Sequence, residues 1–232
     1  MKSLAFVLAV TLAACGSDSK SGGADAPSAP AMVTFSGTVT SKGLSSMPLS
    51  GVTLGAYTDT GTTPVATATT DASGAFTMMV PTGGVALQGY VKATLSGYVD
   101  TYLYPPTIVT ADQTGLTVFM VTPDILTFLS SNLCHDAQDT TKGVIALEVL
   151  DASMAKVAGA TVASSPAAMS DCYNSGGTPS SSVHMTDTDG IGYLLNVPAG
   201  TATVSATKSG ITFKSHQLDA RAGALTLTII QP

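Results

Sequence analysis

Apolar and polar residues alternate along much of the chain from residue 32 onward. In the first such stretch Val33, Phe35 and Val39 fall on one side, and threonines and serines fall on the other. Because side chains of a β-strand point alternately to its two faces, this pattern predicts a strand with one buried face. Comparable short stretches recur up to residue 230, separated by turn-forming residues. The sequence therefore predicts an all-β fold.

One unit of turn, strand and turn occurs twice, in residues 70–83 and residues 186–200. Each copy begins with Thr-Asp, has Gly at the fourth position from the Asp, and ends in Val-Pro-x-Gly. Asp followed by Gly three positions later favours a type I turn that ends in the left-handed region. The strand residues expected to share one face are Phe76, Met78 and Val80 in the first copy and Tyr193, Leu195 and Val197 in the second.

Shorter matches extend this internal repeat. Residues 50–54 correspond to residues 158–162, and the segment around Gly97 corresponds to the segment around Gly210. An offset of roughly 110 residues is far longer than a solenoid period and favours two related domains. We place them at residues 32–121 and 143–232. The segment 164–182 is rich in Ser, Gly and Pro, so we expect it to be a long surface loop.

A short helix is expected between the two domains, in residues 122–142. Thr122, Pro123 and Asp124 supply an N-cap, a proline in the first turn and a favourable acidic residue. Apolar residues at helical spacing follow, at Ile125, Leu126, Phe128, Leu129 and Leu133. This segment is the predicted helical connector.

The order of these motifs resembles the carboxypeptidase regulatory-like domain. The residues that carry the resemblance are Gly-Thr-Val at 37–39, Gly-Val-Thr-Leu at 51–54, residues 69–76, Val-Pro-Thr-Gly at 80–83 and Leu-Ser-Gly-Tyr at 95–98. The resemblance covers residues 32–121 and again 143–232. It implies two tandem transthyretin-like β-sandwiches, and members of this family are mostly non-catalytic modules attached to peptidases, receptors and surface proteins.

Residues 1–14 have the layout of a bacterial signal peptide. Lys2 precedes an apolar run from Leu4 to Leu12 that is too short to cross a bilayer, which takes about 20 residues. Leu12-Ala13-Ala14-Cys15 resembles the lipobox of lipoproteins, which implies that Cys15 is acylated and becomes the first residue of the mature protein. The alternative is an ordinary signal peptide with an incidental cysteine. Gly16, where an Asp would resemble an inner-membrane retention signal, favours the outer membrane.

Residues 15–31 form a predicted disordered tether. They are small and polar, include two prolines between residues 27 and 30, and hold little that a core could bury. A flexible coil of this length spans about 20–25 Å. We therefore expect a protein folded in water and held to the bacterial cell envelope by a lipid anchor.

The composition argues against nucleic acid as a partner. The net charge is −6, the chain has nine Lys and Arg residues, and it has no Trp. His135, His184 and His216 match no zinc or catalytic spacing, so we expect no enzyme activity, cofactor or metal centre. Asp187 and Asp189 only superficially suggest an EF-hand loop, because non-acidic residues occupy its later ligand positions. Weak calcium binding at this turn stays open.

Cys134 and Cys172 remain once Cys15 is acylated. Disulfides persist in the cell envelope, so we expect these two cysteines to be joined. Two free thiols or part of a metal site are the alternatives. The bridge would tie the predicted loop to the connector.

We predict a non-enzymatic outer-membrane lipoprotein that acts as a recognition, adhesion or spacer module. The alternative is an accessory subunit that binds a polysaccharide or peptide through exposed aromatic residues. Tyr98, Tyr102, Tyr104, Pro105 and Pro106 are the local cluster that could serve this purpose. A strand edge packed on its own domain is the other interpretation of the same cluster.

Overall fold

The computed structural model describes residues 29–43 and 46–232. The signal peptide, Cys15 and most of the tether lie outside the described residues. The first half of the described chain holds the strands β1 (Met32–Ser41), β2 (Met47–Pro48), β3 (Thr53–Thr58), β4 (Ala66–Thr69), β5 (Ala75–Pro81), β6 (Gly89–Thr94), β7 (Thr101–Tyr104) and β8 (Gln113–Met120). The second half holds β9 (Lys142–Val149), β10 (Thr161–Ser165), β11 (Ser170–Ser175), β12 (Thr178–Ser180), β13 (Ile191–Pro198), β14 (Gly200–Thr207), β15 (His216–Ala220) and β16 (Leu225–Ile230). The predicted all-β class is confirmed.

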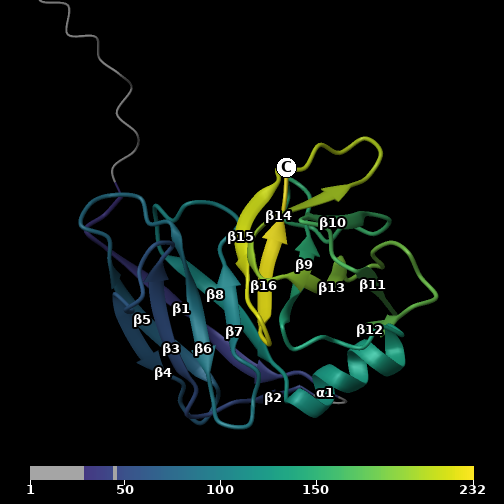
Figure 1. The fold of residues 1–232 in the computed structure, drawn as a ribbon. Coiled ribbons are helices and arrows are strands. Elements are labelled where there is room, and N and C mark those ends of the chain that lie inside the picture. Colours follow the sequence, from purple (N-terminus) through teal and green to yellow (C-terminus); the bar gives the residue numbers. More distant parts are fainter. Residues whose placement is uncertain (1–28, 44–45) are drawn as a thin grey trace, which may run out of the picture.

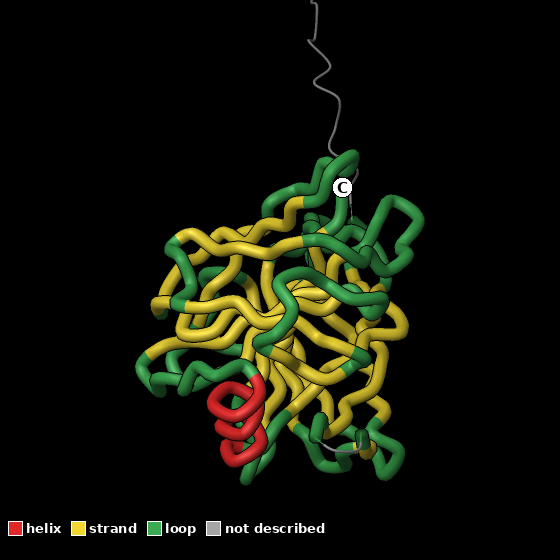
Figure 2. The backbone as a smooth tube through the Cα atoms, turned by 90° about the vertical axis from the view of Figure 1, so that its right-hand side faces the viewer, coloured by secondary structure: helices red, strands yellow, loops and turns green. Residues whose placement is uncertain are grey.

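A short helical segment joins the halves, and Figure 2 shows it at one end of the molecule. It consists of α1 (Pro123–Thr127) followed directly by a π-helix, η1 (Phe128–Leu133). The Thr122 hydroxyl accepts a hydrogen bond from the Ile125 amide at 3.3 Å, and Pro123 occupies the first turn. The predicted helix start is therefore confirmed.

The strands form three sheets (Figure 1). One sheet, which we call the first cover sheet, has four strands with β1 at its centre. β5 and β2 pair with one edge of β1, and β8 pairs with its other edge. A three-stranded sheet, the second cover sheet, has the order β10-β14-β15. Nine strands form the third sheet, in the order β12-β11-β13-β9-β16-β7-β6-β3-β4. We call it the shared sheet because both halves of the chain contribute to it.

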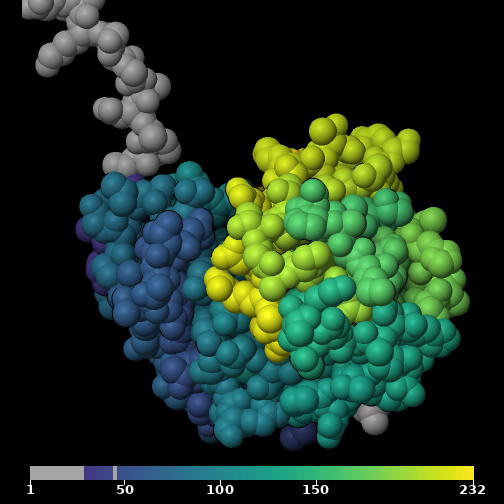
Figure 3. All heavy atoms as spheres, in the orientation of Figure 1, coloured from purple at the N-terminus to yellow at the C-terminus, as the bar shows by residue number. Residues whose placement is uncertain are grey.

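Parallel pairing between β16 and β7 makes the shared sheet continuous. Leu225 pairs with Thr101 and Thr228 with Tyr104, which joins the last strand of the second half to the first half. Figure 3 shows the yellow C-terminal surface meeting the blue and teal surface of the first half. The sequence predicted two sandwiches in tandem but not that one sheet would run through both. The domain boundaries at residues 121 and 143 stay a prediction.

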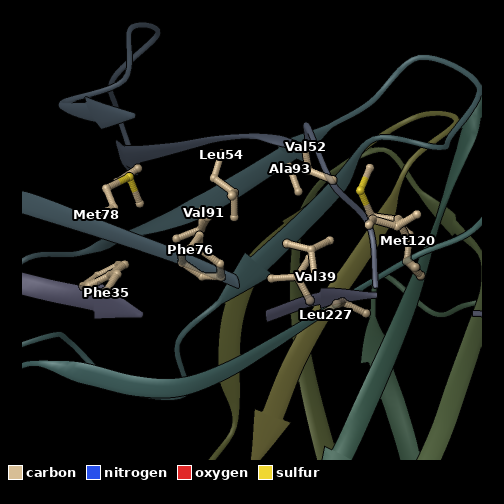
Figure 4. Close-up of a cluster of buried hydrophobic side chains, with 14 of the residues drawn as sticks. Phe35, Val39, Val52, Leu54, Phe76, Met78, Val91, Ala93, Met120 and Leu227 are labelled. Atoms are coloured by element: carbon tan, nitrogen blue, oxygen red, sulfur yellow. The ribbon is translucent and has the colours of Figure 1, made fainter. Parts of the chain in front are cut away.

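The two cover sheets pack on opposite faces of the shared sheet. Val39 and Phe76 of the first cover sheet pack in one core with Leu54 and Val91 of the shared sheet (Figure 4). Val204 and Leu218 of the second cover sheet pack in another core with Ile145 and Leu147. Ile145 packs in the second core, whereas Ala146, the next residue of β9, packs against the first core. Because neighbouring residues of a strand point to opposite faces, the two cover sheets lie on opposite faces of the shared sheet.

The repeated unit makes the same hydrogen bonds in both halves. Thr70 and Thr186 are 4% and 2% exposed. The Thr70 hydroxyl accepts from the Val52 amide at 2.9 Å and donates to the Leu49 carbonyl at 2.6 Å. The Thr186 hydroxyl accepts from the Ala160 amide at 2.9 Å and donates to the Val157 carbonyl at 2.6 Å. A buried threonine therefore fastens the preceding segment to the turn in each copy.

The predicted turn glycines are confirmed by their backbone geometry. Gly74 and Gly190 have φ values of 74° and 69°. Their carbonyls accept from the amides of Val39 and Val149, each at 2.8 Å. A Cβ atom would lie 2.5 Å from the Val39 carbonyl oxygen at Gly74 and 2.8 Å from that of Val149 at Gly190. Both the positive φ and the close approach favour glycine.

The segment 164–182 is not a long surface loop, so that prediction was wrong. Its residues form the end of β10, all of β11 and all of β12. β11 and β12 pair as a hairpin across Gly176 and Gly177, and β11 adds to β13 in the shared sheet. The insertion therefore widens the shared sheet.

One face assignment in the second copy was also wrong. Tyr193 and Leu195 pack with the first core, but Val197 packs with Leu194 in the second core. Four residues of β13, from Leu194 to Val197, lie opposite three residues of β9, from Ile145 to Gly143, which is a β-bulge. Because of the extra residue, the side chain of Val197 points to the opposite face of the sheet from those of Tyr193 and Leu195.

Candidate functional site: the β8 groove

A groove of about 790 Å³ lies between the two halves of the fold. One wall is the edge of β8, and a second wall is the helical connector. The floor is the face of the shared sheet formed by β16, β9, β13 and β11. We call this feature the β8 groove. Its position follows from the offset of the cover sheets, because the first cover sheet ends at β8 while the shared sheet continues beneath it.

The floor of the groove is largely apolar. The strand registers align Leu103, Leu227, Ala146, Tyr193 and Cys172 in one row across five strands. Ala146 and Tyr193 are only half-buried, and Ile229 beside them is half-buried as well. Strands β9 and β16 carry apolar residues toward both faces, as central strands of a covered sheet do.

The helical wall is fixed to the floor at several points. Leu126 and Leu129 line the groove. Cys134, just after the π-helix, is bonded to Cys172 on the floor with a Cα–Cα distance of 5.7 Å. The Leu133 carbonyl accepts from the Ser181 amide at 2.9 Å, so the hairpin of β11 and β12 also holds the connector. Cys134 lines the groove, and the buried Cys172 belongs to the row of residues across its floor.

The β-bulge anchors the remainder of the connector. Asn196, at a φ of 55°, accepts from the Asp139 amide at 2.7 Å through Oδ1 and donates to the Ala137 carbonyl at 3.0 Å through Nδ2. Its backbone amide donates to Gln138 Oε1 at 3.1 Å. Asn196 was not recognised from the sequence, and a lone Asn in a strand pattern is the only signal that was available.

Polar groups gather at one end of the groove. Asn174, 3% exposed, donates through Nδ2 to Asp189 Oδ2 at 2.6 Å, and its Oδ1 has no partner in the described part of the chain. Burial raises the pKa of Tyr193 to about 12, so its hydroxyl stays protonated at neutral pH. Lys156 and Glu148 form an ion pair at 3.1 Å, partly exposed. This end offers hydrogen-bond acceptors beside an apolar floor.

The turn of Asp187 and Asp189 uses its carboxylates within the protein. Asp187 accepts from the amides of Thr188 at 2.7 Å and Gly176 at 2.9 Å, and these donors hold the pKa of its carboxyl below the usual value. Asp189 accepts from the Ile191 amide at 3.1 Å and from Asn174. All four carboxylate oxygens therefore accept a hydrogen bond, and the Oδ2 atoms of Asp187 and Asp189 tie the turn to the hairpin of β11 and β12. Calcium binding here stays an open hypothesis.

The three histidines lie in different settings. His135 is exposed near Ser181, His184 is exposed on a loop, and His216 contacts the Thr228 hydroxyl at 2.8 Å through Nδ1. Burial lowers the pKa of His216. Across residues 29–43 and 46–232, no three His, Cys, Asp or Glu side chains converge as a possible metal site.

The tyrosines of the candidate aromatic cluster are packed against the two cores. Tyr102 and Tyr104 are 9% and 4% exposed, and Tyr98 packs against the first core. Pro105 and Pro106 lie at the rim of the β8 groove. The interpretation as packed strand residues therefore holds for the tyrosines, and an exposed aromatic surface for sugar binding is not formed by them.

These tyrosines instead form an interface between the halves, on the face of the shared sheet opposite the groove. Tyr90 lies 5.2 Å from Tyr104 and 5.6 Å from Tyr102 between ring centroids. Arg221, the single arginine of the chain, stacks over Tyr90 at 4.7 Å and Tyr102 at 4.6 Å and donates to the Tyr104 hydroxyl at 3.2 Å. Arg221 and Tyr90 were not recognised from the sequence because their contact depends on the β7–β16 pairing.

Arg221→Met is expected to lower the free energy of unfolding by about 1–3 kcal/mol, because methionine keeps part of the packing but loses the cation–π contacts and the hydrogen bond. Lys92→Met is the matched control, since Lys92 lies 5.4 Å from the centroid of Tyr102 but makes its contacts within the first half. Chemical denaturation of both variants is the measurement. Equal shifts for the two variants would contradict the role of Arg221 in joining the halves.

No protein-family model and no curated protein sequence matches the chain. Solved structures with some similarity include the Bacillus anthracis TIE protein, with a TM-score of 0.27 and 16% identity over 86% of this chain and 34% of that one. The shaft pilin SpaA of Lactobacillus rhamnosus GG has a TM-score of 0.26 and 14% identity over 87% of this chain and 98% of that chain. The minor pilin GBS52 of Streptococcus agalactiae has a TM-score of 0.27 and 11% identity over 86% and 95%. The chain spans about a third of the TIE protein, and similarities this distant carry no functional argument.

Proposed function

We propose that the protein is a lipid-anchored recognition module of the bacterial outer membrane with no catalytic activity of its own. The observation that carries the proposal is the β8 groove, an open apolar surface with a few hydrogen-bonding groups at one end. Concave sites of this size and composition, about 300–1,000 Å³, are typical of ligand binding. Its lining combines aliphatic side chains with an amide, a protonated phenol and an ion pair, which suit binding better than chemistry.

Rigid construction supports recognition as the task of the groove. The floor belongs to a sheet that runs through both halves, and the helical wall is held by a disulfide and by Asn196. A preorganised site loses less conformational entropy on binding than a loose one. The same rigidity would serve an adhesion or spacer module, and in this proposal the groove is the surface through which the module makes contact.

The lipobox at residues 12–15 supports the anchor. The described fold begins at the end of the tether, where the Ala31 carbonyl accepts from the amides of Thr82 at 3.0 Å and Gly83 at 3.2 Å. The tether would therefore join the fold at the start of β1. No helix in the described ranges is long and apolar enough to cross a membrane.

Cys15→Ala is expected to abolish lipidation and to release the protein into the soluble fraction. A thioether-linked lipid requires the cysteine thiol, and several acyl chains on one residue exceed what stable anchoring takes. Incorporation of labelled palmitate and retention after a carbonate wash are the measurements, with Ser17→Ala as the control. Membrane retention of Cys15→Ala equal to that of the control would contradict the anchor.

Recognition itself is tested by screening the soluble Cys15→Ala protein against a glycan array and a peptide array. We expect binding to one class of ligand, and we expect Ala146→Trp, which fills the half-buried floor position, to remove it. Ala163→Trp, at an exposed position of β10, is the matched control. Binding that survives Ala146→Trp would place recognition elsewhere on the protein, and no binding to either array would contradict recognition of a glycan or a peptide as the function.

A further inference from the structure

We propose that the β8 groove binds a peptide segment in extended conformation, which adds as a new strand to the free edge of β8. Alternate side chains of this peptide would then face the apolar floor. The proposal rests on the proposed recognition function and names the class of ligand. Strand addition is a common mode of peptide recognition, in which main-chain hydrogen bonds supply affinity and pockets for alternate side chains supply specificity.

The first support is the free edge of β8. β8 pairs in parallel with β1 as far as Ser41 and Met120, and within the described ranges no strand pairs with its other edge. The Lys42 amide donates to the Met120 carbonyl at 2.8 Å, so the backbone polar groups of Met120 face β1. Because these groups alternate along a strand, the amides and carbonyls of Thr117 and Phe119 face the groove. They are available to an added strand.

The second support is the incomplete layer above the floor. The first cover sheet packs over β7, β6 and β3, but the shared sheet continues to β16 and β9 with the same face apolar. A strand added about 4.8 Å beyond β8 would continue the cover sheet over β16 and β9, at the usual spacing of about 10 Å between packed sheets. Its inward side chains would then reach Ala146 and Ile229, which are half-buried without it.

The geometry also limits the length of the peptide. A register shift and Gly115, at a φ of 70°, mark a bulge that interrupts β8 near its start. The regular edge therefore runs from Leu116 to Met120, and five residues at about 3.4 Å each span about 17 Å. The partly exposed carboxylate of Asp189, which lines the groove, favours a donor-bearing side chain at one end of the ligand. A segment of five to seven residues fits, with apolar side chains at alternate positions.

Other ligand classes use the groove less completely. A polysaccharide is usually held on exposed aromatic faces, but Tyr193 of the floor is half-buried, and Tyr102 and Tyr104 are buried on the opposite face of the shared sheet. An acyl chain would cover the apolar floor but would leave the amides and carbonyls at the β8 edge unpaired. An extended peptide would cover the apolar floor with its side chains and would pair its backbone with the β8 edge.

The test uses the soluble Cys15→Ala protein and a phage-displayed library of random seven-residue peptides. We expect enrichment of peptides with apolar residues at alternate positions, and at least tenfold weaker binding of the selected synthetic peptide to Ala146→Trp but not to Ala163→Trp. Methylating alternate backbone nitrogens of that peptide removes the donors needed for pairing, so one of the two alternating patterns should also weaken binding at least tenfold. Equal affinity for the unmodified peptide and both methylated forms would overturn strand addition.

Thr117→Pro keeps the proposal testable if Ala146→Trp does not fold. Proline at this position removes the amide that faces the groove, and edge strands tolerate proline where the amide faces solvent. We expect the variant to fold, as judged by its circular dichroism, and to bind the peptide at least tenfold more weakly. Unchanged binding would overturn the role of the β8 edge.

Parallel assays separate failure of this proposal from failure of the proposed function. Radiolabelled palmitate and a glycan array are offered to the same protein and variants. Binding of either one that Ala146→Trp abolishes, with no peptide enriched, would leave recognition standing and overturn the peptide proposal. No binding of any probe would overturn both.

Discussion

Thr186→Val is expected to lower the free energy of unfolding by about 2–5 kcal/mol, although the two side chains have nearly the same shape. The hydroxyl accepts from the Ala160 amide and donates to the Val157 carbonyl, and the residue is 2% exposed. Valine would leave this buried amide and carbonyl without the hydroxyl, and a buried group left unpaired costs about 1–3 kcal/mol. Chemical denaturation at constant pH measures the change.

Thr186→Ser provides the matched control, because serine keeps the hydroxyl and loses one methyl group. We expect it to cost about 1 kcal/mol. If the valine variant were as stable as the serine variant, the hydroxyl group of Thr186 would not contribute to the stability of this turn. Thr70→Val should behave like Thr186→Val, because Thr70 makes the same two hydrogen bonds in the first half.

Comparing the two valine variants also tests the proposed domains. If residues 32–121 and 143–232 unfold as separate units, each substitution should move only one of two transitions. The shared sheet and the stacking of Arg221 on Tyr90 favour a single transition that both substitutions shift. Circular dichroism monitored beside tyrosine fluorescence distinguishes these outcomes, because non-coincident curves reveal independent units.

The features that the sequence predicted well are those set by neighbouring residues. The Asp and Gly of each repeated turn, the cap at Thr122 and the alternation in β1 and β5 all follow from local backbone preferences. A third turn of the same kind escaped recognition. Asp151 accepts from the Ser153 amide at 2.8 Å and the Ala155 amide at 3.0 Å, as Asp71 does from Ser73 and Ala75. Met154, at a φ of 66°, stands where the first copy has glycine, which hid the match.

The segment from residue 164 to residue 182 shows why composition misled. Its Ser, Gly and Pro content is typical of a loop, yet Gly176 and Gly177 form a short hairpin turn. Cys172, Tyr173 and Asn174 are all buried, as residues of a strand covered on both faces are. The bulge in β13 left no comparable signal, because Leu194 and Leu195 are both apolar whichever face each one takes.

The β8 groove could not be predicted from the sequence, because no local pattern specifies it. It exists because β16 pairs with β7, which carries the apolar face of the second half past the edge of the first cover sheet. Parallel pairing between strands more than one hundred residues apart has no turn or spacing signature. The two cysteines that fix the groove wall were recognised in the sequence, but Cys172 was predicted to lie in a loop rather than in a strand of the floor.

Loss of the Cys134–Cys172 bond is expected to remove about 3–4 kcal/mol of stability in the chain-entropy model, since the bond closes a loop with a sequence separation of 38. The effect should be regional. Cys134 ends the helical wall and Cys172 lies in β11, so the connector, β11 and β12 should exchange backbone hydrogen faster after reduction. Residues 32–121 should change little.

Hydrogen exchange with and without reductant maps this effect, and the Cys134→Ala, Cys172→Ala double variant serves as the permanently open control. Because Leu126 and Leu129 line the groove from the helical wall, the same treatment should weaken ligand binding even where the global fold persists. Two free thiols in protein expressed in the periplasm would contradict the bond. Equal loosening of residues 32–121 and of the connector would show that the bond supports the whole fold, and would remove the basis for treating it as the fastening of the groove wall.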